Sequence, residues 1–191
     1  MLCGPNGAGK TTLIRLLGTA LSPTAGTLDV FGLPTNEGIR RRVGMLSHAD
    51  HHYDELTARE NLQLAHDLGA ASAPVLETLA RVGLAERADD AVRGFSAGMR
   101  KRLAFGRLLA RNPELVLLDE PYAGLDPSGA AFVDDLVRGW RAAGTTVVVS
   151  THQVQRVAPL CDGAVVLAAG RIAWTGPAVD ALAHALPPGD A

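Results

Sequence analysis

The sequence predicts an α/β fold, in which helices cover a mostly parallel sheet and a helical subdomain is inserted into the chain. Two patterns predict it: apolar runs typical of strands alternate with helical segments, and residues 57–92 are helical with no strand between them. The length of 191 residues agrees, because a domain usually takes about 100–200 residues. We therefore expect one domain over residues 1–191, with the helical subdomain at about residues 49–95.

The helices are marked by signals at their ends. Thr57 and Glu60 form a capping box at the start of the inserted helical segment. Asp126 can cap a later helix that has Pro127 at its first position. Helices are expected at about residues 10–18, 57–92 (with breaks near 69–74 and at 83), 96–111 and 126–144.

Strands are expected where short apolar runs lie between glycine and proline signals. The run at residues 115–118 is unbroken, which is typical of a strand covered on both faces. Ala169 and Gly170 indicate a hairpin turn between the last two strands. After a short strand that ends at Cys3, the expected strands are residues 27–31, 43–46, 115–118, 145–150, 165–168 and 171–174.

The composition excludes several classes of protein. Apolar residues make up 47% and charged residues 20%, which is typical of a globular chain, and the net charge of −2 argues against a nucleic acid partner. Cys3 and Cys161 lie far apart, so a disulfide framework is not expected and a reducing compartment fits. No apolar stretch approaches the roughly 20 residues that span a bilayer. The protein is expected in the cytosol, or held at a membrane by another protein.

A glycine-rich segment carries the first chemical signal. Residues 4–11 fit the pattern G-x-x-x-x-G-K-[ST] in full. The glycines let backbone N–H groups point inward, and the following helix directs its positive end at bound phosphates. We expect Lys10 to reach the β- and γ-phosphates and the Thr11 hydroxyl to ligate Mg²⁺. The predicted nucleotide-binding residues of this segment are Gly4, Pro5, Asn6, Gly7, Ala8, Gly9, Lys10, Thr11 and Thr12.

Two carboxylates follow the apolar run at residues 115–118 directly. They are Asp119 and Glu120, and they come at the carboxyl end of the expected strand, which is the edge where open α/β sheets bind ligands. We expect Asp119 to hold Mg²⁺ and Glu120 to polarise the attacking water of a phosphoryl transfer.

A third motif points to a family. The run Phe95-Ser96-Ala97-Gly98-Met99, followed by a basic helix, resembles the signature L-S-G-G-Q of the ATP-binding subunits of ABC transporters, with departures at Phe95, Ala97 and Met99. Ser96 and the backbone of Gly98 keep the groups that can donate to a phosphate. The resemblance covers nearly the whole chain in motif order, and it implies a P-loop NTPase of the ABC type.

The resemblance also implies a homodimer that holds two ATP molecules, with Ser96 and Gly98 serving the partner's nucleotide. Residues 123–126 match the family's D-loop at the dimer seam, and His152 matches the switch histidine that contacts the γ-phosphate. His48 stands where the family usually carries a glutamine that ligates Mg²⁺. The implied catalytic residues are Glu120, His152 and Lys10, and the implied metal ligands are Thr11, Asp119 and His48.

The cargo is expected from a finer similarity. The S-H in place of P-Q at residues 47–48, the F-S-A-G-M signature and the block D-E-P-Y-A-G-L-D are similar to the haem-exporter ATPase of cytochrome c maturation. That similarity implies export through separate transmembrane permease subunits, with this chain peripheral at the cytoplasmic face of the membrane. Similar blocks occur in ATPases of general drug or lipid exporters, which stay an alternative.

Two other classes are weighed against a transporter subunit. A soluble ABC-type ATPase acting on DNA would carry a coiled coil between Lys10 and Ser96, where no heptad run is found. A regulatory pseudo-ATPase is disfavoured because Lys10, Glu120 and His152 are all present.

The start of the chain departs from the family pattern. The sequence has three residues before Gly4, whereas a strand usually has about 5–6. The family's upstream β-region, which supplies an aromatic residue that stacks on adenine, has no counterpart here. We therefore expect weak ATP affinity and marginal folding of this chain.

Several charged residues are expected to be surface groups without a special role. Residues 40–42 are three arginines that are typical of an exposed face. His51 and His52 are expected in a solvated loop, and Asp134 and Asp135 as exposed charges on a helix.

Overall fold

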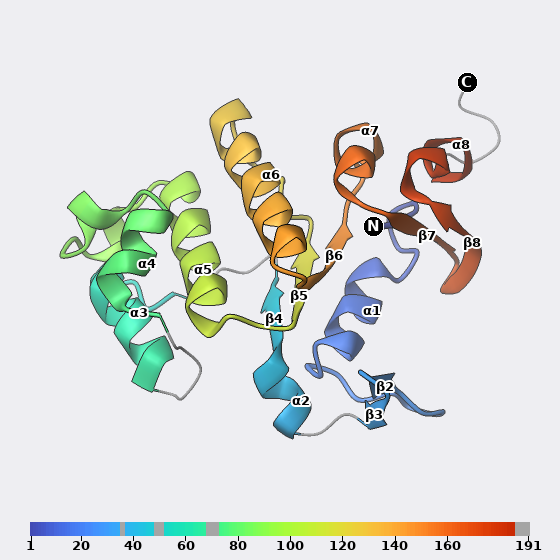
Figure 1. The fold of residues 1–191 in the computed structure, drawn as a ribbon, viewed down its shortest axis with the longest axis horizontal. Coiled ribbons are helices and arrows are strands. Elements are labelled where there is room, and N and C mark those ends of the chain that lie inside the picture. Colours follow the sequence, from blue (N-terminus) through green and yellow to red (C-terminus); the bar gives the residue numbers. More distant parts are fainter. Residues whose placement is uncertain (35–36, 48–51, 68–72, 186–191) are drawn as a thin grey trace.

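The computed structural model describes residues 1–34, 37–47, 52–67 and 73–185. In these residues, a six-stranded sheet has the order β4-β5-β6-β1-β7-β8, and all neighbours are parallel except the β7–β8 hairpin (Figure 1). The predicted mostly parallel α/β fold is confirmed. The strands of this sheet are β1 (Leu2–Cys3), β4 (Val43–Leu46), β5 (Leu115–Asp119), β6 (Thr146–Ser150), β7 (Gly163–Ala168) and β8 (Arg171–Pro177).

Helices cover both faces of this sheet. Alternate side chains of β5 point to opposite faces, as the pleat requires. Leu117 packs in one core cluster with Ile14, whereas Val116 and Leu118 belong to a second cluster that contains Phe105. The first face carries α1 (Lys10–Leu17) and α2 (Glu37–Arg42), and the second α5 (Ala97–Arg111), α6 (Pro127–Ala142) and α7 (Val154–Val157).

The inserted helical segment packs beside α5 (Figure 1). It contains α3 (Ala58–Ala65), α4 (Val75–Arg81) and two short 3₁₀ turns at Ala85–Arg87 and Val92–Gly94. The predicted capping box is present, because the Thr57 N–H donates to Glu60 Oε2 at 2.7 Å and the Glu60 N–H donates to Thr57 Oγ1 at 3.1 Å. The break expected at residue 83 is also present, since Gly83 adopts a φ of 71° after α4.

The segment between α1 and β4 differs from the expectation. The strand expected at residues 27–31 is reduced to β2 (Asp29–Val30), which pairs with β3 (Leu33–Pro34) in a separate two-stranded sheet. Phe31 and Gly32 have φ values of 59° and 71°. Positive φ at both central residues is typical of a tight hairpin turn, so the chain reverses where the sequence indicated a continuing strand.

Helix α2 was not expected, and its arginines make specific contacts. Arg40 Nε donates to Thr19 Oγ1 at 3.1 Å. The Arg42 guanidinium forms a bidentate pair with Glu114 at 2.7 Å and lies 4.1 Å from the centroid of the Phe31 ring. Arg40 and Arg41 are exposed, as expected of a surface face, and the contacts of Arg40 and Arg42 also tie α2 to its neighbours.

The remaining elements close the second face of the sheet. After β8, a 3₁₀ turn at Ala178–Asp180 leads into α8 (Leu182–Ala185), and another 3₁₀ turn at Ala158–Leu160 follows α7. Within the residues that the structure describes, no helix has both the length and the apolar character needed to cross a membrane.

Candidate functional site

The glycine-rich segment forms a loop that joins β1 to α1. Gly4, Gly7 and Gly9 have φ values of 137°, 77° and 100°, which other residues rarely adopt. Gly9 directly precedes α1 and provides no side-chain cap, and the first turn of α1 contains no acidic residue. The first N–H groups of α1 therefore have no intrahelical partner, and together with the helix dipole they favour an anion.

Lys10 is the first residue of α1, and its side chain reaches back into this loop. The side chain is buried, and its Nζ donates to the carbonyl oxygens of Gly4 at 2.8 Å and Pro5 at 3.1 Å. The ammonium is therefore held within the curve of the loop. The N–H groups of the first turn of α1, which have no intrahelical acceptor, follow directly after the loop. A phosphate bound there meets a positive charge and several backbone donors together.

The β7–β8 hairpin supports the loop from the side. The Gly170 N–H donates to the Ala8 carbonyl at 3.1 Å. A Cβ added to Gly4 would lie 2.1 Å from the Leu167 carbonyl oxygen, so only glycine fits at this position. Ala169 and Gly170 have φ values of 48° and 74°, as expected for the turn of the predicted hairpin.

Asp119 and Glu120 lie where β5 ends. Asp119 is buried, and its Oδ1 accepts a hydrogen bond from Ser150 Oγ at 2.5 Å. Glu120 has a φ of 47°, and its Oε2 lies 2.9 Å from His152 Nδ1. A residue without glycine's freedom rarely adopts this φ, so the surrounding contacts hold the Glu120 backbone in place.

The sheet order brings these groups to one edge. Strands β5, β6 and β1 are parallel neighbours, so the ends that carry Asp119, His152 and the glycine loop lie side by side. One pocket joins the loop to the segment after β6, because its lining includes Gly4, Pro5, Asn6, Thr151 and His152. Lys10, Asp119, Glu120 and His152 therefore come from the ends of neighbouring parallel strands or from the residues that follow them.

The residues at this edge fit a magnesium-bound triphosphate. The Thr11 hydroxyl is exposed on the first turn of α1, and the Asp119 carboxylate lies at the end of β5. These are the hard oxygen ligands that Mg²⁺ prefers, with substrate phosphates and water completing its shell. Thr12 is also exposed on this turn. His48 lies outside the described residues, and among those described no group of three or more His, Cys, Asp or Glu could hold a metal ion.

The signature segment lies at a second, separate pocket. Ser96 caps α5, because its Oγ accepts a hydrogen bond from the Met99 N–H at 3.2 Å, and the residue is exposed. The pocket lining also includes Gly98, Gly124 and Asp126. Backbone donation from Gly129, together with the Ser128 hydroxyl, lowers the pKa of Asp126 and keeps this helix cap ionised. Because Ser96 is exposed, a neighbouring molecule can reach it.

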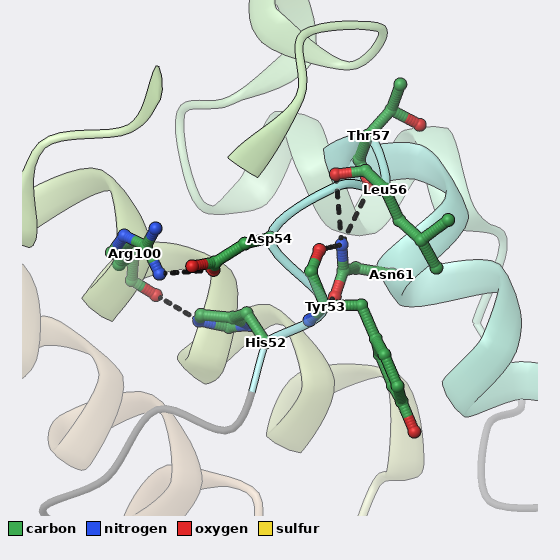
Figure 2. Close-up of polar contacts among 7 residues, drawn as sticks. All are labelled: His52, Tyr53, Asp54, Leu56, Thr57, Asn61 and Arg100. Atoms are coloured by element: carbon green, nitrogen blue, oxygen red, sulfur yellow. Dashed lines mark hydrogen bonds and ion pairs between the residues drawn. The ribbon is translucent and has the colours of Figure 1, made fainter. Parts of the chain in front are cut away.

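The loop that precedes α3 is bound to the start of α5 (Figure 2). A ring nitrogen of His52 lies 2.9 Å from the Arg100 carbonyl, and Asp54 pairs with the Arg100 guanidinium at 2.7 Å. This hydrogen bond with Arg100 lowers the pKa of Asp54. The side-chain amide of Asn61 donates to the Tyr53 carbonyl at 3.0 Å. His52 was expected in a solvated loop, but it is half-buried against α5; His51 lies outside the described residues.

Ser150 was not among the expected site residues, and Asp134 is not exposed as expected. Ser150 is fully buried between Asp119 and Glu120. Its only signal in the sequence was its place, as a polar residue at the end of a strand rich in β-branched residues. Asp134 was expected to be exposed, but only 14% of its side chain is accessible, and it pairs with Arg156 at 2.7 Å. The Arg156 guanidinium in turn lies over the Tyr122 ring, 5.3 Å from its centroid.

The replacement Asp134→Asn is expected to lower the free energy of unfolding by about 1–3 kcal/mol, because the partly buried Arg156 guanidinium loses its charged partner. The neighbouring replacement Asp135→Asn is a matched control, since Asp135 is exposed and pairs with Arg138 on the same helix. It is expected to change stability by less than about 0.5 kcal/mol. Urea denaturation of both variants measures the difference, and equal effects would show that the Asp134 pair contributes no more than a surface charge.

Comparison with known proteins identifies the family. Residues 1–123 match the family model described as ABC transporter. The match covers more than half of the chain, and the chain therefore belongs to the ABC transporter family. The resemblance read from the three motifs is confirmed at this level.

The named relatives are ATP-binding proteins, one of drug resistance and one of drug export. The chain is 43% identical over 183 residues to daunorubicin resistance ATP-binding protein DrrA3 of Streptomyces coeruleorubidus. The aligned region covers 92% of this chain and 58% of that protein. It is 38% identical over 175 residues to a fluoroquinolones export ATP-binding protein of Mycobacterium tuberculosis, covering 90% and 58%. The chain thus spans somewhat over half the length of these curated relatives.

Solved structures have the same fold. A dimeric ATP-binding cassette in a post-hydrolysis state bound to ADP and Pi is 27% identical, with a TM-score of 0.83 over 93% of this chain and 84% of that chain. An ATP binding subunit of an ABC transporter is 28% identical, with a TM-score of 0.84 over 96% and 79%. The predicted P-loop fold of the ABC type is confirmed.

Proposed function

We propose that this chain binds and hydrolyses Mg·ATP and thereby powers an ABC exporter whose membrane-spanning subunits are separate proteins. The observation that carries the proposal is the placement of Lys10, Asp119, Glu120 and His152 at one edge of the sheet, beside an open helix N-terminus. The names and titles of the relatives, which concern ATP-binding proteins and an ADP-bound cassette, support it.

Each residue has a distinct part in the proposed hydrolysis. Lys10 and the N–H groups of α1 bind the β- and γ-phosphates, where negative charge must be neutralised. Thr11 and Asp119 hold Mg²⁺, which neutralises charge on the phosphate oxygens when bound. The Glu120 carboxylate orients and polarises the attacking water, and His152 contacts the γ-phosphate. The 2.9 Å contact between Glu120 Oε2 and His152 Nδ1 holds the two side chains next to each other.

A second copy of the chain completes the proposed site. Ser96 is exposed at the N-terminus of α5, and its pocket includes the D-loop residues Gly124 and Asp126. We expect this surface to meet the triphosphate held by the partner's loop, so that two chains enclose two nucleotides. The dimeric form of a structural relative supports this arrangement. In this proposal the segment at about residues 49–95 acts as the helical subdomain.

The names of the relatives support a proposal for the class of cargo. Their names concern resistance to daunorubicin and export of fluoroquinolones or Nod factor. These names favour the alternative of a drug or lipid exporter, and they do not support haem export for cytochrome c maturation. The chain would then work at the cytoplasmic face of the membrane, bound to its permease subunits. A regulatory protein without hydrolysis stays the second candidate, which the presence of Glu120 and His152 disfavours.

The replacement Lys10→Met tests nucleotide binding, because it keeps the apolar stem and removes the ammonium. We expect the Kd for a fluorescent ATP analogue with Mg²⁺ to rise at least about tenfold. Arg15→Met is the matched control: Arg15 is an exposed cation on the same helix, and its loss should change the Kd less than about twofold. Equal effects of the two variants would contradict the proposal. The same titration tests the expected weak affinity of this chain, which a micromolar Kd would refute.

A further inference from the structure

Ser150 is the last residue of β6 and has no exposed surface. It pairs in register with Asp119, across the two parallel strands that reach the candidate site. His152 follows two residues later, and the intervening Thr151 N–H donates to the Leu2 carbonyl at 3.1 Å. The end of β6 is therefore held on both sides, by β5 and by β1.

The Ser150 hydroxyl forms hydrogen bonds with both acidic residues, as the donor to one and the acceptor from the other. Its hydroxyl donates to Asp119 Oδ1 at 2.5 Å. The same oxygen accepts from the Glu120 N–H at 3.0 Å, and that N–H also donates to the Ser150 carbonyl oxygen at 3.2 Å. A hydroxyl has one donor and two acceptor positions, so both contacts can exist at once.

The two hydrogen bonds fix the positions of the two carboxylates that the proposed phosphoryl transfer uses. The donated hydrogen bond fixes one oxygen of the Asp119 carboxylate, so its other oxygen is left to face a metal ion. The accepted hydrogen bond holds the Glu120 backbone at its φ of 47°. Without the hydroxyl, the Glu120 N–H keeps its longer bond to the Ser150 carbonyl but loses the shorter one, so the strained backbone is held less firmly and the carboxylate can turn away.

We propose that Ser150 is a positioning residue for ATP hydrolysis, which acts through Asp119 and Glu120 and does not touch the nucleotide itself. The inference rests on the proposed function. It assigns to a buried hydroxyl the task of holding both acidic groups in one arrangement, so that the metal ligand and the water-orienting carboxylate keep their relative position.

A matched pair of variants isolates the hydroxyl. Ser150→Thr and Ser150→Val place nearly the same volume in the core, and only the threonine retains the oxygen. The first measurement is amide hydrogen exchange at Glu120, followed by NMR in the protein without nucleotide. We expect the Glu120 amide to exchange several-fold faster, up to about tenfold, in Ser150→Val than in Ser150→Thr. Equal exchange rates would overturn the inference, whatever the ATPase activity.

The second measurement separates positioning from a general loss of structure. We expect kcat of Ser150→Val to fall about ten- to a hundredfold relative to Ser150→Thr, with the Kd for a non-hydrolysable ATP analogue within about twofold. In a Glu120→Gln background the kcat ratio between the two variants should shrink, because one of the two carboxylates that Ser150 positions is gone while Asp119 remains. A parallel loss of binding and kcat, or the same kcat ratio in that background, would overturn it.

The two measurements also keep this inference distinct from the proposed function. If the unchanged protein hydrolyses no ATP, the proposed function fails, and the exchange rate of the Glu120 amide still decides whether the hydroxyl holds that residue. If the unchanged protein is active and the threonine and valine variants behave alike, the inference on Ser150 fails and the proposed function stands.

Discussion

Replacing Glu120 by glutamine is expected to lower the rate of ATP hydrolysis about 100- to 10,000-fold, while ATP still binds. Glutamine keeps the shape of the side chain and its reach to His152, 2.9 Å away. It removes the negative charge that orients and polarises the attacking water. Because the phosphates are bound by Lys10 and the N–H groups of α1, binding should be kept, and the ATP-bound dimer should accumulate.

Glu114→Gln is the matched control for this experiment. Glu114 immediately precedes β5 at its opposite end, is exposed and pairs with Arg42. The same chemical change there should alter the rate less than about twofold. Steady-state phosphate release and gel filtration with Mg·ATP measure the two outcomes. Unchanged hydrolysis in Glu120→Gln would refute the assigned role of Glu120, and slow hydrolysis without an ATP-bound dimer would count against the shared site.

Replacing Gly4 by alanine is expected to destabilise the fold by about 3–5 kcal/mol. Part of this cost is the positive φ of 137°, which disfavours any side chain. The larger part is steric, since the new Cβ would lie 2.1 Å from the Leu167 carbonyl oxygen on β7. Neither atom can move easily, because the carbonyl oxygen belongs to the backbone of β7 and the Cβ is attached directly to the backbone that follows the neighbouring strand β1.

Gly7→Ala separates the two parts of this cost. Gly7 also has a positive φ, of 77°, but an added Cβ would meet no atom within 4 Å. Its cost should be that of the backbone conformation alone, about 1–2 kcal/mol. Urea denaturation without nucleotide compares the two variants. If they differ by less than about 0.5 kcal/mol, the close approach of Gly4 to β7 is not a source of instability.

Local signals in the sequence predicted the elements that carry strong end markers. The capping box at Thr57 and the Asp126 cap with Pro127 are both present, because these caps depend only on residues within one turn. The region around α2 was predicted poorly. Its helix of six residues, Glu37–Arg42, lacks such markers and is tied by its arginines to Thr19 and Glu114. The hairpin turn at Phe31 and Gly32 lies beside it, with the Phe31 ring against the Arg42 guanidinium.

The chain's amino acids alone established the phosphate-binding loop, the two carboxylates and the family, because each of these is a short run of residues whose chemistry depends on neighbours in sequence. Tertiary structure decided which distant groups meet. Ser150 contacts Asp119 and Glu120, and Asp134 pairs with Arg156, only because parallel strands and packed helices bring residues more than 20 positions apart into contact. Strand register sets such contacts, and register depends on how the whole sheet packs.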